Sequence, residues 1–180
     1  MRTHEAVRGT AIPMRVLVAG VGNTLRSDDG FGVAVANRLE AMRLPEGVRV
    51  VETGISGMTL VQELMEGYDG LIILDTVDRD RPPGTIMLIE PDLPDPNAMS
   101  PAERHQLVAD THIATPSRVM LMAKAMGCLP PQVLLIGCQP VDAEALGMDL
   151  SPEVAAAVDV AVAEVERHLE LLCAGAVGGA

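Results

Sequence analysis

The sequence predicts an α/β fold, a three-layer sandwich in which about five mainly parallel strands form a twisted sheet with helices on both faces. Strand-like and helix-like segments alternate along most of the chain. The strand-like segments are short and almost wholly apolar, which is typical of parallel strands that are buried on both faces. Several of them run into glycine-containing loops, and open α/β sheets place their binding sites in such loops, at the carboxyl ends of the strands.

The first half of the chain contains four of the expected strands and two of the expected helices. Apolar runs predict strands over residues 14–20, 48–52, 71–74 and 85–90. Apolar residues at three- and four-residue spacing predict one helix that begins near Gly30 and another that follows the glycine-bearing loop at 53–57. The inner faces of these helices are expected to comprise Phe31, Val35, Leu39 and Met42 in the first and Leu60, Val61, Leu64 and Met65 in the second.

The second half opens with residues 91–111, a proline-rich polar stretch without periodicity. A connection this long within a compact domain is typical of a functional loop or a lid. Thr115 and Pro116 predict the start of a helix that stops at Gly127, a fifth strand is expected over 132–137, and a long final helix begins at Ser151 and Pro152. The inner faces are expected to comprise Val119, Met122, Ala123 and Met126, and then Val154, Val158, Ala161, Val165, Leu169 and Leu172.

The length and composition predict one globular domain. The chain has 180 residues, of which 48% are apolar. We expect residues 1–13 to be a disordered N-terminal extension, residues 14–174 to form a single α/β domain and residues 175–180 to be a flexible tail. Apolar runs stay well below the roughly 20 residues that span a bilayer, and the N-terminal segment lacks the apolar stretch of a signal peptide. A cytoplasmic protein without membrane attachment is therefore expected.

Charge and side-chain content exclude further classes of partner. The formal net charge is -12, and the chain has one Phe, one Tyr and no Trp. Such a chain offers neither attraction for a phosphate backbone nor rings on which bases could stack, so we expect no nucleic acid. The three cysteines, Cys128, Cys138 and Cys173, are isolated and predict neither a disulfide framework nor a structural zinc site.

The loop after the first strand, in the sequence GVGNTLRSDDGFG at 20–32, ends in two adjacent carboxylates, Asp28 and Asp29. Gly20 and Gly22 suit a dinucleotide site, but the third glycine of that fingerprint is replaced by Leu25. Negative charge at the start of the following helix would also repel a phosphate. The loop therefore indicates a cation site, although helix capping could account for either aspartate alone.

A second carboxylate position lies at the end of the third strand, where Asp75 closes the apolar run LIILD. If the strand order begins 2-1-3, the first and third strands are neighbours, and Asp29 and Asp75 face one crevice. An aspartate that is partly desolvated there needs a cation, a proton or hydrogen-bond donors. The alternative is that Asp75 caps the turn before Asp78.

His112 is the favoured third ligand among the four histidines. His4 lies in the extension, His105 lies among solvated residues, and His168 suits a hydrogen-bonded position at the edge of the core. His112 directly precedes the expected cap at Thr115. Two carboxylates and one imidazole suit a borderline divalent transition metal with an open coordination position.

Together, GVGNTLRSDDGFG, LIILD and the placement of His112 twenty-five residues before Gly137 resemble the hydrogenase maturation proteases, which are endopeptidases that process the large subunit of nickel-iron hydrogenases. The segments ETGISGM and LGMDLSP extend the resemblance. It implies that Asp29, Asp75 and His112 are the metal-contacting and catalytic positions. Several members carry Glu where Asp29 stands, so Asp28 is an alternative for that position.

The resemblance implies that the protein recognises nickel already inserted in the precursor of the large subunit and then removes the precursor's C-terminal extension. The nickel ion belongs to this substrate, the precursor is the partner, and the protease is expected to be a monomer or weak homo-oligomer. Its contact surface is expected to include the loops at 53–57 and 91–111.

Cleavage has two candidate mechanisms. The metal could polarise the scissile carbonyl or bind a water, or the Asp29 and Asp75 pair could act as acid and base while sharing a proton. Two other functions remain open. One is a nickel-checking binding module without catalysis, and the other is a dinucleotide-dependent enzyme that uses Gly20, Gly22 and Glu52.

Overall fold

The structure, a computed structural model, describes residues 14–103, 105 and 115–177. Its sheet has five strands in the order β2-β1-β3-β5-β4. They are β1 (Val16–Val21), β2 (Val48–Gly54), β3 (Gly70–Thr76), β4 (Ile86–Ile89) and β5 (Gln132–Cys138). The first three and β5 run parallel, and β4 pairs antiparallel with β5 at one edge. The predicted mainly parallel sheet is confirmed, and β1 and β3 are neighbours.

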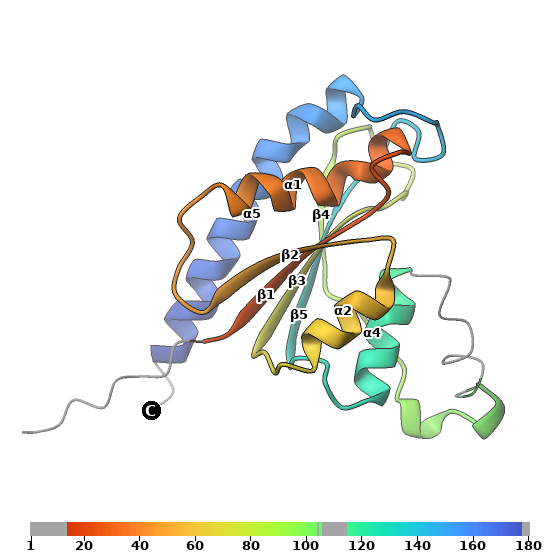
Figure 1. Cartoon of the computed structure of the whole chain (residues 1–180), viewed down its shortest axis with the longest axis vertical. Coiled ribbons are helices and arrows are strands. Elements are labelled where there is room, and N and C mark those ends of the chain that lie inside the picture. Colours follow the sequence, from red (N-terminus) through yellow and green to blue (C-terminus); the bar gives the residue numbers. More distant parts are fainter. Residues whose placement is uncertain (1–13, 104, 106–114, 178–180) are drawn as a thin grey trace, which may run out of the picture.

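Helices cover both faces of the sheet, which gives three layers (Figure 1). One face carries α1 (Phe31–Glu40) and α5 (Pro152–Val177), and the other carries α2 (Gly57–Leu64) and α4 (Pro116–Ala125). Two short 3₁₀ helices, η1 (Ser27–Gly30) and η2 (Pro96–Ala98), lie in the connections. The first leads directly into α1. The second gives the segment after β4 some regular structure that the sequence pattern does not predict.

The two faces of the sheet build two hydrophobic cores, because alternate residues of each buried strand point to opposite sides. Val16, Val18 and Ile72 pack beneath α1 and α5, whereas Leu17 and Ile73 pack beneath α2 and α4. The predicted stripe of α5 is confirmed by the burial of Val154, Ala161, Val165 and Leu169. This helix continues to Val177, three residues beyond the domain boundary expected at 174.

Two methionines that the helical spacing places on inner faces are exposed. Met65 is 61% exposed and Met126 is 53% exposed. Each occupies the C-cap position, one residue beyond the end of α2 or α4, with backbone angles still in the right-handed helical region. The expected face therefore holds only within the helix bounds.

Glycines allow α1 to approach the sheet closely. A Cβ at Gly32 would lie 2.1 Å from the carbonyl oxygen of Leu74 in β3 and 2.3 Å from that of Val21 in β1. A Cβ at Gly20 would lie 2.5 Å from the carbonyl oxygen of Gly32. The glycines of this loop therefore place the start of α1 directly over the carboxyl ends of β1 and β3. No helix in the described ranges is long and apolar enough to cross a membrane.

Candidate active site

Asp75 lies near the carboxyl end of the central strand β3 and is only 7% exposed. Burial raises its pKa to about 7, a backbone hydrogen bond from Thr76 opposes this rise, and the negative charge of Asp29 adds to it. With this pKa, the Asp75 carboxyl group is partly protonated and partly ionised near neutral pH. Asp75 belongs to the strand itself. Asp78 accepts the backbone N–H of Asp80 in the next turn, so Asp78 takes the capping role that the sequence left open for Asp75.

Asp29 lies in η1, which follows β1, and its side chain is half-buried. Burial raises its pKa. The backbone N–H of Asn23, which donates to Oδ2 at 2.9 Å, and the charge of Arg26 oppose that rise, while Glu144 adds to it. One oxygen of the Asp29 carboxyl group is thus held by a hydrogen bond from the same loop. The helix α1 makes no side-chain capping bond at its start, so Asp29 is not its N-cap.

Asp29 and Asp75 come from neighbouring strands and interact electrostatically, because the charge of Asp29 raises the pKa of Asp75. A hydrogen bond fixes their relative placement: the Thr76 hydroxyl donates to the backbone oxygen of Asp28 at 2.7 Å. This bond ties η1 to the end of β3. The predicted neighbouring of β1 and β3 thus brings the two carboxylates to one rim, and their role as the site residues stays a prediction.

Asp28 has a different role from its neighbour. It is 1% exposed, and its carboxylate accepts four hydrogen bonds from the connection between β5 and α5. The donors are the backbone N–H groups of Val141, Asp142 and Ser151 and the hydroxyl of Ser151. Burial alone would raise the pKa of Asp28, but these hydrogen bonds outweigh it and lower the pKa. All four hydrogen bonds come from the protein itself, which favours Asp29 over Asp28 as the site carboxylate.

The third predicted ligand, His112, lies outside the described residues, so its place beside the two carboxylates stays a prediction. Among the residues that the structure does describe, no three His, Cys, Asp or Glu side chains form a group that could hold a metal ion. The described part of the site is thus a pair of carboxylates. His168 occupies the predicted position at the edge of the core, where its Nδ1 lies 2.7 Å from the backbone oxygen of Glu164.

The two cysteines whose side chains are described do not supply an activated nucleophile. Burial raises the pKa of Cys138 to about 12, and the negative charge of Asp28 adds to this effect. Burial also raises the pKa of Cys128. A catalytic cysteine requires a lowered pKa, so both thiols are in the wrong state for nucleophilic attack at neutral pH.

Sequence patterns did not predict the site contacts of the 139–151 loop, which connects β5 to α5 and borders the site. The Arg26 guanidinium forms an ion pair with Glu144 at 2.9 Å, and the charge of Glu144 acts on Asp29. At the start of the loop, buried Gln139 accepts the N–H groups of Arg79 and Arg81 and thereby orders the turn after β3. No local spacing signals these contacts. The one sequence signal in this loop is the motif LGMDLSP.

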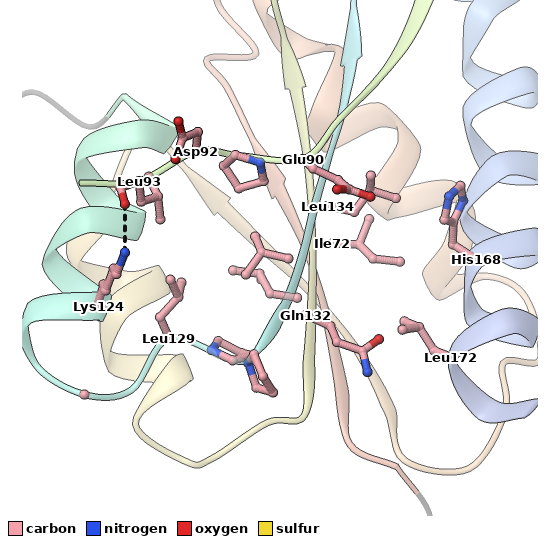
Figure 2. Close-up of a pocket in the computed structure, with 16 residues that line it drawn as sticks. Ile72, Glu90, Asp92, Leu93, Lys124, Leu129, Gln132, Leu134, His168 and Leu172 are labelled. Carbon is pink, nitrogen blue, oxygen red and sulfur yellow. Dashed lines mark hydrogen bonds between the residues drawn. The ribbon is translucent and has the colours of Figure 1, made fainter. Parts of the chain in front are cut away.

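A cavity of about 790 Å³ lies away from these carboxylates, near the amino ends of β3 and β5. Figure 2 shows Lys124 of α4 on one side of it and His168 and Leu172 of α5 on the other. Lys124 donates to the backbone oxygen of Leu93 at 2.8 Å.

The cavity opens where β4 stops. The register pairs Ile89 with Leu135, so Pro91 would be opposite Val133, and proline has no N–H with which to continue the ladder. Neither Asp29 nor Asp75 lines the cavity.

The fold and the rim carboxylates define an α/β enzyme domain with an acidic site at the carboxyl edge of its sheet. Comparisons with known proteins identify the family. The model of the hydrogenase maturation protease family matches residues 33–168, a range that includes Asp75 and His112 and begins just after Asp29. The chain belongs to the hydrogenase maturation protease family, and it is therefore a hydrolase of the endopeptidase type.

Individual relatives agree with the family assignment. The chain is 40% identical over 158 residues to the hydrogenase expression/formation protein HupD of Rhodobacter capsulatus, which covers 87% of this chain and 72% of that protein. Among solved structures, the hydrogenase maturating endopeptidase HybD of E. coli superposes with a TM-score of 0.68 at 29% identity, covering 87% of this chain and 93% of that one.

A second solved structure, the hydrogenase 2 maturation peptidase of a Thaumarchaeota archaeon, has a TM-score of 0.62 at 36% identity. The match covers 86% of this chain and 97% of that one. The resemblance drawn from the sequence motifs is thereby confirmed.

Proposed function

We propose that this protease removes a C-terminal extension from the precursor of a nickel-iron hydrogenase large subunit and that it recognises the nickel ion already inserted in that precursor. The observation that carries the proposal is the convergence of Asp29 and Asp75 at the carboxyl ends of two neighbouring strands. The names of the relatives, which are hydrogenase maturation proteins and endopeptidases, support the class of substrate.

The charges at the rim suit a cation that arrives with the substrate. Asp75 is buried, and burial disfavours its charged form. A divalent ion placed beside both carboxylates would offset that desolvation, and it would favour the charged form of each. We propose that Asp29 and Asp75 contact the nickel ion of the precursor and that His112 completes the set.

The same two carboxylates also suit acid and base work in the cleavage itself. Two carboxyl groups whose surroundings differ commonly divide these roles. Asp75 has the higher pKa and can donate a proton to the leaving amine, whereas Asp29, which lies nearer to solvent, can accept one from an attacking water. The alternative route has the nickel ion polarise the scissile carbonyl.

A processing assay with purified components tests the proposal. Wild-type protein is incubated with nickel-loaded and with nickel-free precursor, and shortening of the large subunit is followed on a gel. We expect cleavage of the loaded form only. The variant Asp75→Asn should reduce the rate by about 100-fold or more, the usual contribution of an acid or base group.

The matched control is Asp69→Asn, which changes the exposed aspartate just before the amino end of the same strand. It should process the precursor at the wild-type rate. Equal cutting of loaded and nickel-free precursor would contradict nickel recognition, and full activity of Asp75→Asn would contradict the site. Binding of precursor without any shortening would instead indicate a nickel-checking module.

A further inference from the structure

Exposed apolar side chains gather on the loops around the two rim carboxylates. Leu146 is 89% exposed and Met148 is 77% exposed, the highest values for large apolar residues in the described chain. Five of the eleven exposed large apolar residues there lie in the loops after β1, β2 and β5, namely Leu25, Ile55, Val141, Leu146 and Met148, and a sixth, Met58, lies in the first turn of α2. Single exposed apolar residues are ordinary, but a group of them beside a site is typical of an interaction surface.

The 139–151 loop that carries Leu146 and Met148 is firmly held. Its two ends are joined by Asp28, which accepts from Val141 and Asp142 at one end and from Ser151 at the other. Its middle pairs with the loop after β1, because Gly147 accepts the N–H of Ser27 at 2.8 Å and donates to Leu25 at 3.1 Å. A loop fixed by this many contacts still leaves its leucine and methionine in solvent, so their exposure is a feature of an ordered surface.

This surface is continuous with the candidate site. Ser27 and Leu25, which bond to Gly147, lie on the same short connection as Asp29. In Figure 1 the blue loop before α5 passes close to the orange start of α1. On the other side of that connection, the N–H of Gly22 donates to Gly54, which directly precedes exposed Ile55. Apolar residues therefore flank the Asp29 connection on two sides.

The charge of the 139–151 loop has one sign. It contains Asp142, Glu144 and Asp149 and no Lys or Arg, in a chain whose formal net charge is -12. Arg26, from the connection after β1, pairs with Glu144. A complementary partner segment has apolar side chains to cover Leu146 and Met148 and carries positive charge.

We propose that the 139–151 loop is a docking surface for the polypeptide substrate, which places an apolar, positively charged segment across Leu146 and Met148 while its cleavage region reaches Asp29 and Asp75. The identity of the bound segment rests on the proposed function. The inference adds to it a contact region that the sequence did not predict. An endopeptidase must hold a polypeptide over its catalytic groups, and this surface is ordered before the substrate arrives, which reduces the entropy lost on binding.

The test is the steady-state cleavage of nickel-loaded precursor by the double variant Leu146→Gln with Met148→Gln. We expect KM to rise roughly tenfold with little loss of kcat, because anchor residues bind substrate without taking part in the chemistry. The matched control is Met126→Gln with Leu171→Gln, which removes one exposed methionine and one exposed leucine elsewhere on the molecule. The control should keep the wild-type KM.

A binding measurement separates this inference from the proposed function. Fluorescently labelled precursor is titrated with Asp75→Asn protein, with and without the Leu146 and Met148 substitutions, at low and at high salt. The dissociation constant should rise roughly tenfold when Leu146 and Met148 are substituted, and that of the Asp75→Asn protein without these substitutions should rise with salt.

An unchanged KM and dissociation constant would overturn the docking surface even if cleavage proceeds as proposed. A change in oligomeric state without a change in KM would overturn it too. If wild-type protein did not cleave the precursor but bound it, and if the Leu146 and Met148 substitutions weakened that binding, only the proposed function would be contradicted.

Discussion

Asp28 and Asp29 are adjacent in the sequence, but their pKa values shift in opposite directions because their side chains have different surroundings. The four hydrogen bonds that Asp28 accepts stabilise its charged form and lower its pKa, whereas burial raises the pKa of Asp29. Both residues lie in one turn of 3₁₀ helix, so composition and spacing treat them alike. The sequence could identify the pair of carboxylates at this loop. It could not identify the role of Asp28, because the groups that donate to it lie 113 to 123 residues away.

The raised pKa of Asp75 predicts a pH-dependent effect on stability. Its pKa is about 7 in the folded protein, well above the ordinary value of an aspartate, so the folded state binds a proton more tightly than the unfolded state. The stability of wild-type protein should therefore fall as pH rises from about 4 to about 7. Asp75→Asn removes that loss. Its unfolding free energy relative to wild type should increase over this range by an amount on the order of a few kcal/mol.

Urea unfolding of the isolated protein at about pH 5 and about pH 8 measures this difference. Asp69→Asn, at the exposed start of the same strand, provides the control and should show a much smaller change between the two conditions. If the difference in unfolding free energy between Asp75→Asn and wild type were the same at the two pH values, the carboxyl group of Asp75 would be ionised at both. The burial of Asp75 would then have little effect on its pKa.

At the scale of the elements, the first strand, its loop and the first helix form one packed unit. The predicted alternation of strand and helix is confirmed, and so is the start of α4 at Pro116. Helix ends were predicted less well, because Met65 and Met126 continue the apolar spacing although each lies one residue beyond its helix and is exposed. The glycines near the first loop are explained by packing: they remove Cβ atoms where α1 meets the sheet. That requirement replaces the phosphate-binding interpretation of Gly20 and Gly22.

The close contact of α1 predicts that Gly32→Ala is strongly destabilising. The new Cβ would lie 2.1 Å from the Leu74 oxygen and 2.3 Å from the Val21 oxygen, both of which are backbone atoms that cannot move independently of the sheet. We expect a loss of about 2 to 4 kcal/mol of unfolding free energy, measured by thermal or urea unfolding.

Gly70→Ala is the matched control for this substitution. A Cβ there would meet its nearest neighbour, Leu172 Cδ1, at 3.5 Å, which is an ordinary contact. Its effect should stay below about 1 kcal/mol. Equal stability of the two variants would show that α1 can shift away from β1 and β3 without loss.

At the scale of the whole molecule, Asp28 joins three parts of the chain that are distant in sequence. Its carboxylate connects η1 to the beginning of the 139–151 loop and to the start of α5. The sheet order and the convergence of Asp29 and Asp75 could be predicted, because both follow from alternating elements and from where parallel strands end. The conformation of the 139–151 loop could not be predicted, since it depends on hydrogen bonds between side chains and backbone groups that are distant in the sequence.

Asp28→Asn should therefore loosen this loop as well as destabilise the protein. The amide can accept only at its oxygen, and its NH₂ group would face N–H or hydroxyl donors. We expect a loss of about 3 kcal/mol near neutral pH, and roughly tenfold faster hydrogen exchange at the amides of Val141, Asp142 and Ser151. Because the pKa of Asp28 is lowered, the stability that it contributes is present above the ordinary pKa of an aspartate and is lost as pH falls below it.

Mass spectrometry of exchanged peptides reports both ends of the loop in one experiment. Asp149→Asn, an exposed substitution in the same loop, should leave the exchange of these amides unchanged. Protection that persisted in Asp28→Asn would mean that the contacts of Ser27 and Arg26 are sufficient to hold the loop.

The separation between the cavity near β5 and the rim carboxylates has a consequence for inhibitor discovery. Compounds chosen for their fit to this cavity, between α4 and α5, would occupy the opposite end of the sheet and leave Asp29 and Asp75 open to the precursor. A thermal-shift screen would score such compounds as hits, although they do not compete with substrate. Blocking this enzyme calls for a ligand shaped like a peptide, with a cationic group for the carboxylate rim.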